Sequence, residues 1–224
     1  MRTLEKYSPP QEEKDWDLVA LHLGDADKAR KEAQALFRSR HAEIGLSYQP
    51  LLYALIRLWP EEAVTVVETG VRTGISTFYA LSALRHRGTD STLYSCDPAY
   101  LHPTQAKERI QEAQGSSFAP DELFEAWVFL GQKSADALPR IRREAPTWDI
   151  FVHDSDHREA NMAFELSLAW EALRPGGLLV VDDFHGPGHV PSDPTRHDAF
   201  HEFVKERGVP WGTIGGAALV RKPE

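Results

Sequence analysis

From residue 65 onward, short apolar segments alternate with longer amphipathic segments, and this alternation constrains the fold of the chain more than any other feature. The short segments are apolar at successive positions, which is typical of strands buried on both faces of a parallel sheet. The amphipathic segments predict helices that cover those faces. The predicted strands are Thr65–Glu68, Thr92–Cys96, Trp127–Leu130, Trp148–Val152 and Leu178–Val181, and the predicted helices are Thr77–Arg85, Pro103–Gln114, Ser134–Arg143 and Arg158–Leu173.

The last part of the chain predicts a further helix at Arg196–Arg207 and two strands within Trp211–Val220, on either side of Gly215-Gly216. Two strands joined by so short a connection pair antiparallel, which suits one edge of the sheet. We therefore predict the α/β class, with a Rossmann-like, seven-stranded, mostly parallel sheet and helices on both faces. In open sheets of this kind, ligands bind beyond the carboxyl ends of the strands.

Residues 1–60 predict an N-terminal helical cap that precedes a domain spanning residues 61–224. Within this polar segment, Gly24-Asp25 separates one helical stretch from the next, and Pro60 ends the last stretch. The cap would cover a substrate pocket or pack against a second subunit. The apolar residues that recur at helical spacing before Pro60 are Leu51, Leu52, Leu55, Ile56 and Trp59.

The charge balance and the single cysteine exclude several classes of function. Lys and Arg number 25 against 34 Asp and Glu, a net charge of −9, so we expect no nucleic-acid-binding surface. Cys96 alone cannot form an intrachain disulfide or a cysteine-based zinc site. Because the sequence contains neither an apolar run of about 20 residues nor the pattern of a signal peptide, we expect no membrane span and a cytoplasmic location.

The turn from Glu68 to Ser76, which follows the first predicted strand, reads Glu-Thr-Gly-Val-Arg-Thr-Gly-Ile-Ser. Its glycines, Gly70 and Gly74, allow the backbone to approach a ligand closely, and Ser76 supplies a hydroxyl at the start of the helix. Asp97 follows the second strand, where a carboxylate can accept the hydroxyls of a ribose. These residues together predict a nucleoside site; an ordinary tight turn and a loop-capping aspartate are the alternatives.

Acidic residues follow the fourth and fifth predicted strands: Asp154 after one, and Asp182 and Asp183 after the next. Neighbouring strands lie about 4.8 Å apart, so these carboxylates would crowd together at one edge of the sheet. Because like charges repel at this distance, they require protonation or a bound cation, and oxygen ligands suit Mg²⁺ first, then Mn²⁺ or Ca²⁺. The alternative is that Asp154 or Asp156 caps the following helix while the other two acids are solvated in a loop.

These motifs together resemble the class I S-adenosylmethionine-dependent methyltransferases. The chain is similar to the metal-dependent small-molecule O-methyltransferases of the catechol and macrocin type, and Asp154-Ser-Asp-His157 is also similar to cephalosporin-hydroxylase-like relatives. The Arg-Pro-Gly-Gly turn before the fifth strand and Asp182-Asp183 after it are specific in combination. The resemblance covers residues 60 to about 222 and implies a hydroxylated small molecule as methyl acceptor and a homodimer as the assembly.

The resemblance also implies how the cofactor is held. S-Adenosylmethionine would lie across the carboxyl ends of the first three strands. The residues implied to bind it are Glu68 and Ser76 at the methionine end, Gly70 and Gly74 along its length, Asp97 at the ribose and Ser134 beside the adenine.

For the chemistry, the resemblance implies that Asp154, Asp182 and Asp183 bind a divalent cation. Such a cation would lower the pKa of the acceptor hydroxyl and fix its direction against the methyl carbon of the sulfonium. Either His157 or Asp156 would take the proton, and the sequence does not decide between them.

Two other functions stay open: an oxidoreductase that uses a nicotinamide nucleotide, and a catalytically inactive nucleoside-binding module. The oxidoreductase fits less well because the glycine spacing is neither GxGxxG nor a P-loop, and clustered acids would repel a pyrophosphate. Among the histidines, we expect His197 and His201 to be surface or lid residues. His185 and His189 would touch substrate or metal from a loop rich in Gly and Pro.

Overall fold

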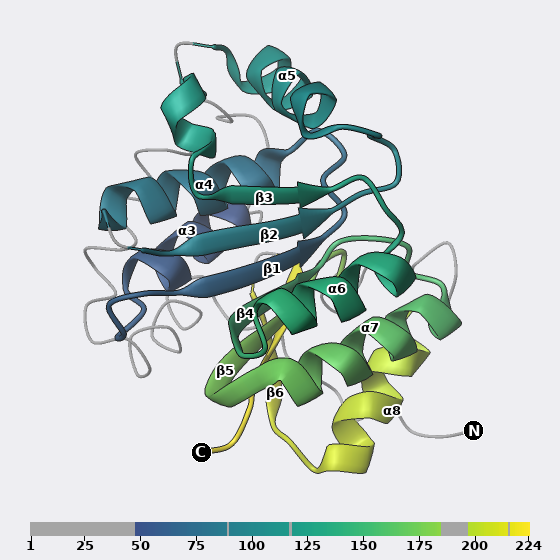
Figure 1. Ribbon diagram of the computed structural model, residues 1–224. Helices are drawn as coiled ribbons and strands as arrows, with labels where there is room; N and C mark the ends of the chain where they lie inside the picture. Colours follow the sequence, from purple (N-terminus) through teal and green to yellow (C-terminus); the bar gives the residue numbers. More distant parts are fainter. Residues whose placement is uncertain (1–47, 89, 117, 185–196, 215) are drawn as a thin grey trace.

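The computed structural model describes residues 48–88, 90–116, 118–184, 197–214 and 216–224, and these contain a seven-stranded sheet (Figure 1). The strand order is β3-β2-β1-β4-β5-β7-β6. Pairing is parallel from β3 to β5, and β7 pairs antiparallel with both β5 and β6. The predicted α/β class and its antiparallel edge are therefore confirmed. The strands are β1 (Thr65–Thr69), β2 (Thr92–Cys96), β3 (Trp127–Leu130), β4 (Trp148–His153), β5 (Leu173–Val181), β6 (Trp211–Ile214) and β7 (Ala217–Arg221).

Helices cover both faces of this sheet (Figure 1). Buried side chains of α3, α4 and α5 belong to the core cluster on one face, and those of α6, α7 and α8 belong to the cluster on the other. None of the described helices is both long and apolar enough to cross a lipid bilayer. The helices are α3 (Gln49–Arg57), α4 (Ile75–Arg87), α5 (Pro103–Gln114), α6 (Ser134–Glu144), α7 (Glu159–Ala172) and α8 (Asp198–Arg207), with a short 3₁₀-helix η1 (Asp121–Phe124).

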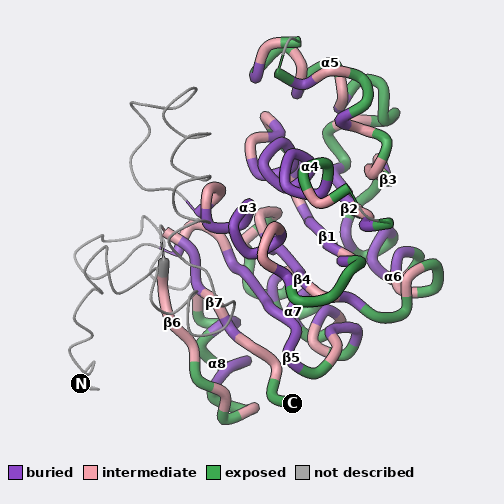
Figure 2. The backbone as a smooth tube through the Cα atoms, turned by 90° about the vertical axis from the view of Figure 1, so that its left-hand side faces the viewer, coloured by how far each residue is buried: buried purple, intermediate pink, exposed green. Residues whose placement is uncertain are grey.

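The central strands are buried on both sides, as their continuous apolar sequences predict (Figure 2). On β1, Val66 packs in the cluster with α4, while the next residue, Val67, packs in the cluster with α6 and α7. The same alternation places Ile150 of β4 on one face and Phe151 on the other. Since successive side chains of a strand point to opposite faces, an uninterrupted apolar run contributes side chains to the core on each face of the sheet.

Strand β5 begins earlier than predicted. It starts at Leu173, directly after α7, and Leu173 pairs with Trp148 of β4. The next pair is Ile150 with Leu178, so the intervening residues of β5 form an irregular bulge. Gly176 within it has φ +75°, which suits glycine. The Arg-Pro-Gly-Gly segment is therefore a bulge inside the strand, and its prediction as a turn before the strand was wrong.

The described end of the predicted N-terminal cap contributes to the main core. Leu52 and Ile56 of α3 are buried in one cluster with Val66 and Phe78. The boundary at residue 60 stays a prediction, because residues 1–47 lie outside the described part of the chain. The connection after α3 is held by Arg87 at the end of α4, whose guanidinium donates hydrogen bonds to the carbonyl oxygens of Ile56, Arg57, Trp59, Glu61 and Glu62.

Candidate active site

A cavity of about 800 Å³ opens at the carboxyl ends of β1, β2 and β4. This volume lies within the range of about 300–1,000 Å³ that small-molecule sites occupy. The cavity lies at the edge where ligands bind in open α/β sheets. The predicted site residues that line it are Gly70, Asp97, Ser134, Asp154 and Asp156.

The glycines of the β1–α4 turn are required by close packing. Gly70 has φ +86°, and a Cβ placed on it would lie 2.0 Å from the backbone oxygen of Asp154. Gly74 has φ +71°, and a Cβ there would lie 2.1 Å from Cγ1 of Ile110 on α5. The close contacts at both glycines are with the protein itself, and the predicted approach to a ligand stays a prediction.

Asp97 holds this turn by its carboxylate. Oδ2 accepts hydrogen bonds from the backbone N–H of Val71, at 2.9 Å, and of Arg72, at 2.8 Å. Oδ1 accepts one from the backbone N–H of Ala99 at 2.7 Å. A carboxylate has about four acceptor positions, so these bonds leave about one for a ligand hydroxyl. Asp97 therefore combines the loop-capping role with a position on the cavity wall.

Glu68 and Ser76 do not line the cavity, yet they form a buried polar group beside it. Glu68 is 1% exposed, and its Oε2 accepts hydrogen bonds from Thr77 Oγ1 at 2.7 Å and from Ser95 Oγ at 2.8 Å. Burial raises the pKa of Glu68, and hydroxyl donors, Ser76 among them, offset part of that effect. Its Oε1 is buried without a hydrogen-bond partner in the described structure. Such an oxygen is suited to a cationic donor such as the ammonium of a methionine moiety.

Two of the three predicted metal ligands are paired. Burial and the neighbouring Asp182 raise the pKa of Asp154 well above its ordinary value. The two acids are neighbours because the backbone N–H of Asp182 donates a hydrogen bond to the carbonyl oxygen of His153 at 2.9 Å. Asp183 adopts φ +58°, in the left-handed region. Among the described residues, no three His, Cys, Asp or Glu side chains are grouped as a metal site. The oxygen donors of Asp154 and Asp182 fit a hard cation, because this pair requires either a proton or a positive charge.

The two predicted bases have different surroundings. Asp156 accepts a hydrogen bond from Nε of Arg158 at 2.6 Å, which lowers the pKa of Asp156. His157 Nε2 lies 3.2 Å from the backbone oxygen of Asp182. Because a carbonyl oxygen only accepts hydrogen bonds, Nε2 carries the hydrogen and the basic lone pair of the neutral ring is on Nδ1.

A buried network beneath the cavity was not predicted. Glu165 of α7 and His153 of β4 are both 0% exposed, and His153 Nδ1 lies 2.7 Å from Glu165 Oε2. The same carboxylate accepts hydrogen bonds from Thr69 Oγ1 at 2.6 Å and Ser155 Oγ at 2.7 Å. Asn161 donates to it at 2.8 Å. The sequence carries one indication, since Glu165 falls on the buried face of the predicted helix, four residues after Asn161.

Ser134, predicted beside the adenine, belongs to this network. Its hydroxyl donates to Oδ1 of Asn161 at 3.2 Å. Thr69, Ser134, Ser155 and Asn161 all line the cavity. Glu165 thus connects the end of β1, the end of β4 and the first turns of α6 and α7 through side chains that form the cavity wall.

The C-terminal histidines pack in an aromatic cluster. The rings of Phe184 and His197 have centroids 4.4 Å apart, and those of His201 and Trp211 are 5.4 Å apart. His201 is exposed, in agreement with its predicted surface position. His185 and His189 lie outside the described residues.

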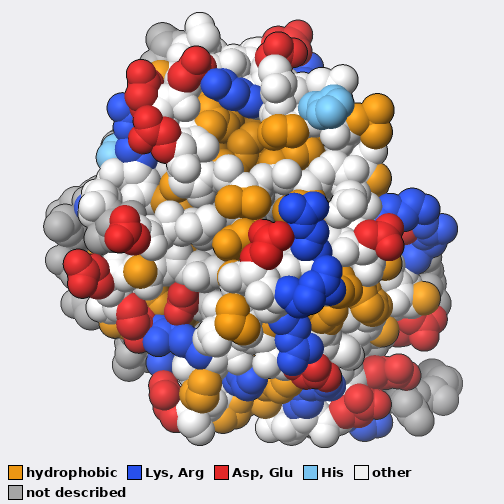
Figure 3. All heavy atoms as spheres, viewed as in Figure 1, with side chains coloured by type: hydrophobic (Ala, Val, Ile, Leu, Met, Phe, Trp, Pro, Cys, Tyr) orange, Lys and Arg blue, Asp and Glu red, His pale blue; other side chains and the backbone are white. Residues whose placement is uncertain are grey.

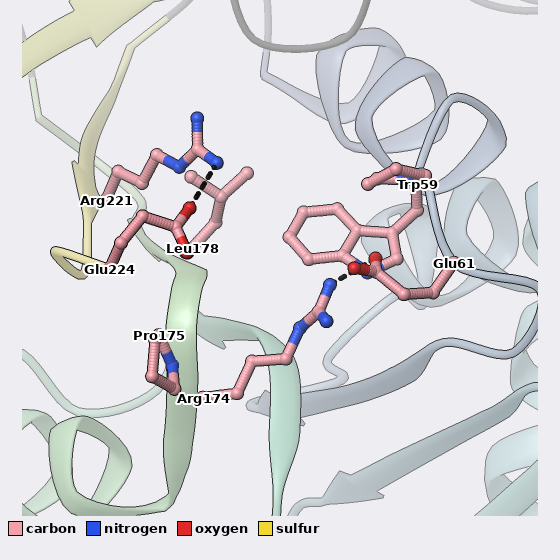
Figure 4. A pocket seen from close by; sticks show the side chains of 9 residues that line it. Trp59, Glu61, Arg174, Pro175, Leu178, Arg221 and Glu224 are labelled. Atoms are coloured by element: carbon pink, nitrogen blue, oxygen red, sulfur yellow. Dashed lines mark hydrogen bonds and ion pairs between the residues drawn. The ribbon is translucent and has the colours of Figure 1, made fainter.

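A second, small cavity of about 100 Å³ lies near the amino ends of β4 and β5 (Figure 4). Arg174 forms ion pairs there with Glu61 and with Asp149, the latter at 2.6 Å. The guanidinium also lies 5.2 Å from the ring centroid of Trp59. These contacts join the segment after α3 to the sheet. The residues around this small cavity therefore have a structural role, and we do not interpret the cavity as a ligand site.

Charged side chains of both signs are interspersed on the face drawn in Figure 3. On α6, Arg140 lies 3.0 Å from Glu144, and Arg142 lies 2.7 Å from Glu171 of α7. These exposed pairs are typical of a solvated helix face.

Comparison with known proteins gives the family. Residues 67–184 match a family model described as a methyltransferase domain. A Mycobacteroides abscessus protein provisionally named an O-methyltransferase is 28% identical over 187 residues, which cover 80% of this chain and 79% of that protein. The rhamnosyl O-methyltransferase of Mycobacterium tuberculosis H37Rv is 25% identical over 173 residues, which cover 70% of this chain and 66% of that protein.

The solved structure of the O-methyltransferase TomG from Streptomyces achromogenes, in complex with S-adenosylmethionine, has the same fold. It superposes with a TM-score of 0.55 and 20% identity over 96% of this chain and 100% of that chain. The family model spans more than half of the sequence, from the middle of β1 to the residues that follow β5. The chain therefore belongs to the methyltransferase-domain family.

Proposed function

We propose that this protein transfers a methyl group from S-adenosylmethionine to a hydroxyl group of a small molecule, assisted by a divalent cation. The observation that carries the proposal is one cavity whose wall includes both Asp97 and Asp154. Asp97, which can accept a ribose hydroxyl, and Asp154, which with Asp182 requires a proton or a cation, thus line the same cavity. This is the arrangement that donor and acceptor require for in-line transfer.

In this proposal the cofactor extends from Ser134 to Glu68. Asp97 accepts one ribose hydroxyl, because three of its acceptor positions are already taken by the backbone N–H groups of Val71, Arg72 and Ala99. Gly70 and Gly74 keep the turn close to the cofactor. The buried Oε1 of Glu68 accepts a hydrogen bond from the methionine ammonium, with Ser76 at the carboxylate.

A cation, when bound, would be held by Asp154 and Asp182 and would lower the pKa of the acceptor hydroxyl. Asp183 as a third ligand stays a prediction from the resemblance, since the three acids are not grouped in the described structure. We propose His157 as the base. The ion pair with Arg158 lowers the pKa of Asp156 and makes it the weaker base of the two. The Nε2 hydrogen of His157 bonds to the Asp182 carbonyl, which orients Nδ1 as the proton acceptor.

For the acceptor we propose a sugar hydroxyl, supported by the relatives named as rhamnosyl O-methyltransferases. A homodimer and a cytoplasmic location stay predictions, and light scattering would test the former.

The test has two stages. Calorimetry should show binding of S-adenosylhomocysteine and no binding of NAD⁺; the reverse would favour an oxidoreductase. A methyl-transfer assay with rhamnosides and catechols, with Mg²⁺ or with EDTA, then separates an enzyme from an inactive binding module.

The substitution Asp154→Ala should abolish Mg²⁺-dependent turnover, whereas Asp136→Ala, an exposed position on α6, should not. Equal turnover with Mg²⁺ and with EDTA would remove the cation from the proposal.

A further inference from the structure

Tyr48, which directly precedes α3, contacts Asp154 from the segment predicted as an N-terminal cap. Its side chain is 1% exposed, and its hydroxyl donates a hydrogen bond to Oδ2 of Asp154 at 3.0 Å. A buried phenol of this kind requires a partner for its hydroxyl. Here the partner is a carboxyl proposed to bind the cation.

The second acid of the proposed pair is placed by the sheet. The backbone N–H of Asp182 donates a hydrogen bond to the carbonyl oxygen of His153, the residue before Asp154, at 2.9 Å. Asp154 and Asp182 therefore lie beside each other at the ends of β4 and β5, and the Tyr48 hydroxyl contacts one of them.

We propose that Tyr48 is a positioning residue for methyl transfer: its hydroxyl holds Asp154 in the orientation in which Asp154 and Asp182 bind one divalent cation. The inference rests on the proposed function. Without the hydroxyl, Asp154 Oδ2 would lose a donor in a buried setting, and the carboxyl could rotate away from Asp182. Removing such an outer partner of a metal ligand typically weakens metal binding or activity by about 10–100-fold.

A purely structural role for Tyr48 makes a different prediction, and α3 supplies the control. Tyr53 on the same helix is also buried, at 2% exposure, and its hydroxyl makes a hydrogen bond of 2.7 Å with His86 Nδ1. His86 belongs to the last turn of α4, and neither Tyr53 nor His86 lines the 800 Å³ cavity. The substitutions Tyr48→Phe and Tyr53→Phe each remove one buried hydroxyl and keep the ring, so only their relation to Asp154 differs.

The experiment measures Mg²⁺ and S-adenosylhomocysteine affinity by calorimetry, together with kcat and KM at a series of Mg²⁺ concentrations. For Tyr48→Phe we expect Mg²⁺ to bind about 10–100-fold more weakly, S-adenosylhomocysteine affinity to change less than about threefold, and kcat to recover at high Mg²⁺. Tyr53→Phe should keep the wild-type affinity for Mg²⁺.

Wild-type Mg²⁺ affinity in Tyr48→Phe would overturn the inference and leave the proposed function intact. An equal loss of affinity in both variants would also overturn it, because helix α3 would then act only as a structural support. If the wild-type protein binds S-adenosylhomocysteine but no Mg²⁺, the cation and the positioning role both fail while the methyltransferase proposal survives. Failure of the wild type to bind S-adenosylhomocysteine would defeat the proposed function itself, and this inference with it.

Discussion

The imidazole of His153 and the carboxylate of Glu165 form a contact of 2.7 Å between two side chains that are both 0% exposed. Burial alone would raise the pKa of Glu165, but the hydrogen bond and charge interaction with His153, together with hydroxyl donors, outweigh it and lower the pKa. The folded protein therefore favours the ionised carboxylate, which accepts bonds from four neighbouring side chains.

Replacement of Glu165 by Gln should lower the free energy of unfolding by about 1–3 kcal/mol at pH 7. Since the folded pKa is lowered, the stabilisation is present above the ordinary value of 4.5 and is lost as the pH falls through the folded value. The difference in free energy of unfolding between wild type and Glu165→Gln should thus shrink below about pH 4.5. Denaturant titrations at several pH values would measure it. Glu171→Gln, an exposed change on α7, should cost less than about 0.5 kcal/mol. A difference for Glu165→Gln that is independent of pH would contradict this account.

The turn after β1 should tolerate no side chain at Gly70. Alanine there combines φ +86° with a Cβ 2.0 Å from a backbone oxygen. Gly88→Ala is the matched control, because Gly88 has φ +67° with nothing within 4 Å of the added Cβ. Gly88→Ala should cost about 1–2 kcal/mol of stability from its backbone conformation. Gly70→Ala should cost more and also lose cofactor affinity; equal melting temperatures for the two variants would show that the turn can move away from β4.

Loss of the Asp97 carboxylate should weaken S-adenosylhomocysteine binding by about 10–100-fold, equivalent to about 1.4–2.8 kcal/mol. Asp97→Ala removes a ligand acceptor and frees the backbone N–H groups of Val71, Arg72 and Ala99. Calorimetry gives the affinity directly, with Asp136→Ala as the exposed control. Unchanged affinity in Asp97→Ala would mean that the ribose is held elsewhere.

Arg87 should be important for stability although it lies away from the cavity. Its guanidinium donates to carbonyl oxygens in the last turn of α3 and in the segment that follows, so Arg87→Ala leaves several acceptors without this donor. We expect a loss of about 1–3 kcal/mol, measured by denaturant unfolding. Arg85→Ala, an exposed change one position before His86, should stay within about 0.5 kcal/mol of wild type. Similar losses in both variants would contradict a specific role for Arg87.

Asp154→Asn should stabilise the metal-free protein at pH 7. The folded pKa of Asp154 is raised by burial and by Asp182, so the wild type is destabilised as the pH rises through that value. Asparagine removes the charge and can still accept the Tyr48 hydrogen bond. The gain in melting temperature should disappear below the ordinary value of 3.8. Added Mg²⁺ should raise the melting temperature of the wild type only, and stabilisation of the variant by Mg²⁺ would argue that the cation binds elsewhere.

The sequence was sufficient for the sheet and for the turn, because both depend on local patterns. Continuous apolar runs predicted β1 to β5, and Gly70 and Gly74 predicted the tight turn after β1. The nucleoside site that these glycines and Asp97 indicate stays a prediction. The beginning of β5 could not be predicted in this way, since Arg174 to Gly177 has the composition of a turn. Its place in the strand is set by the pairing of Leu173 with Trp148, a contact between distant residues.

The same limit applies to the site. Tyr48 and Asp154 are separated by 106 positions, and they meet because Tyr48 and α3 pack in one core cluster with α4 and the sheet. Glu165 falls on the buried side of α7, but three of its four partners come from β1, β4 and the β4–α7 connection. Spacing in one sequence identifies a buried carboxylate; the fold decides which hydroxyls and which imidazole reach it.

The position of β7 has a consequence for how the protein is made. It is the last strand in the described chain, yet it is inserted between β5 and β6. While the polypeptide leaves the ribosome, the parallel strands can assemble before β7 emerges, and β5 then presents an unpaired, apolar edge. Exposed edges of this kind recruit other chains. Slow elongation through the final helix would therefore favour aggregation, and chaperone capture at that stage should raise the yield of native protein.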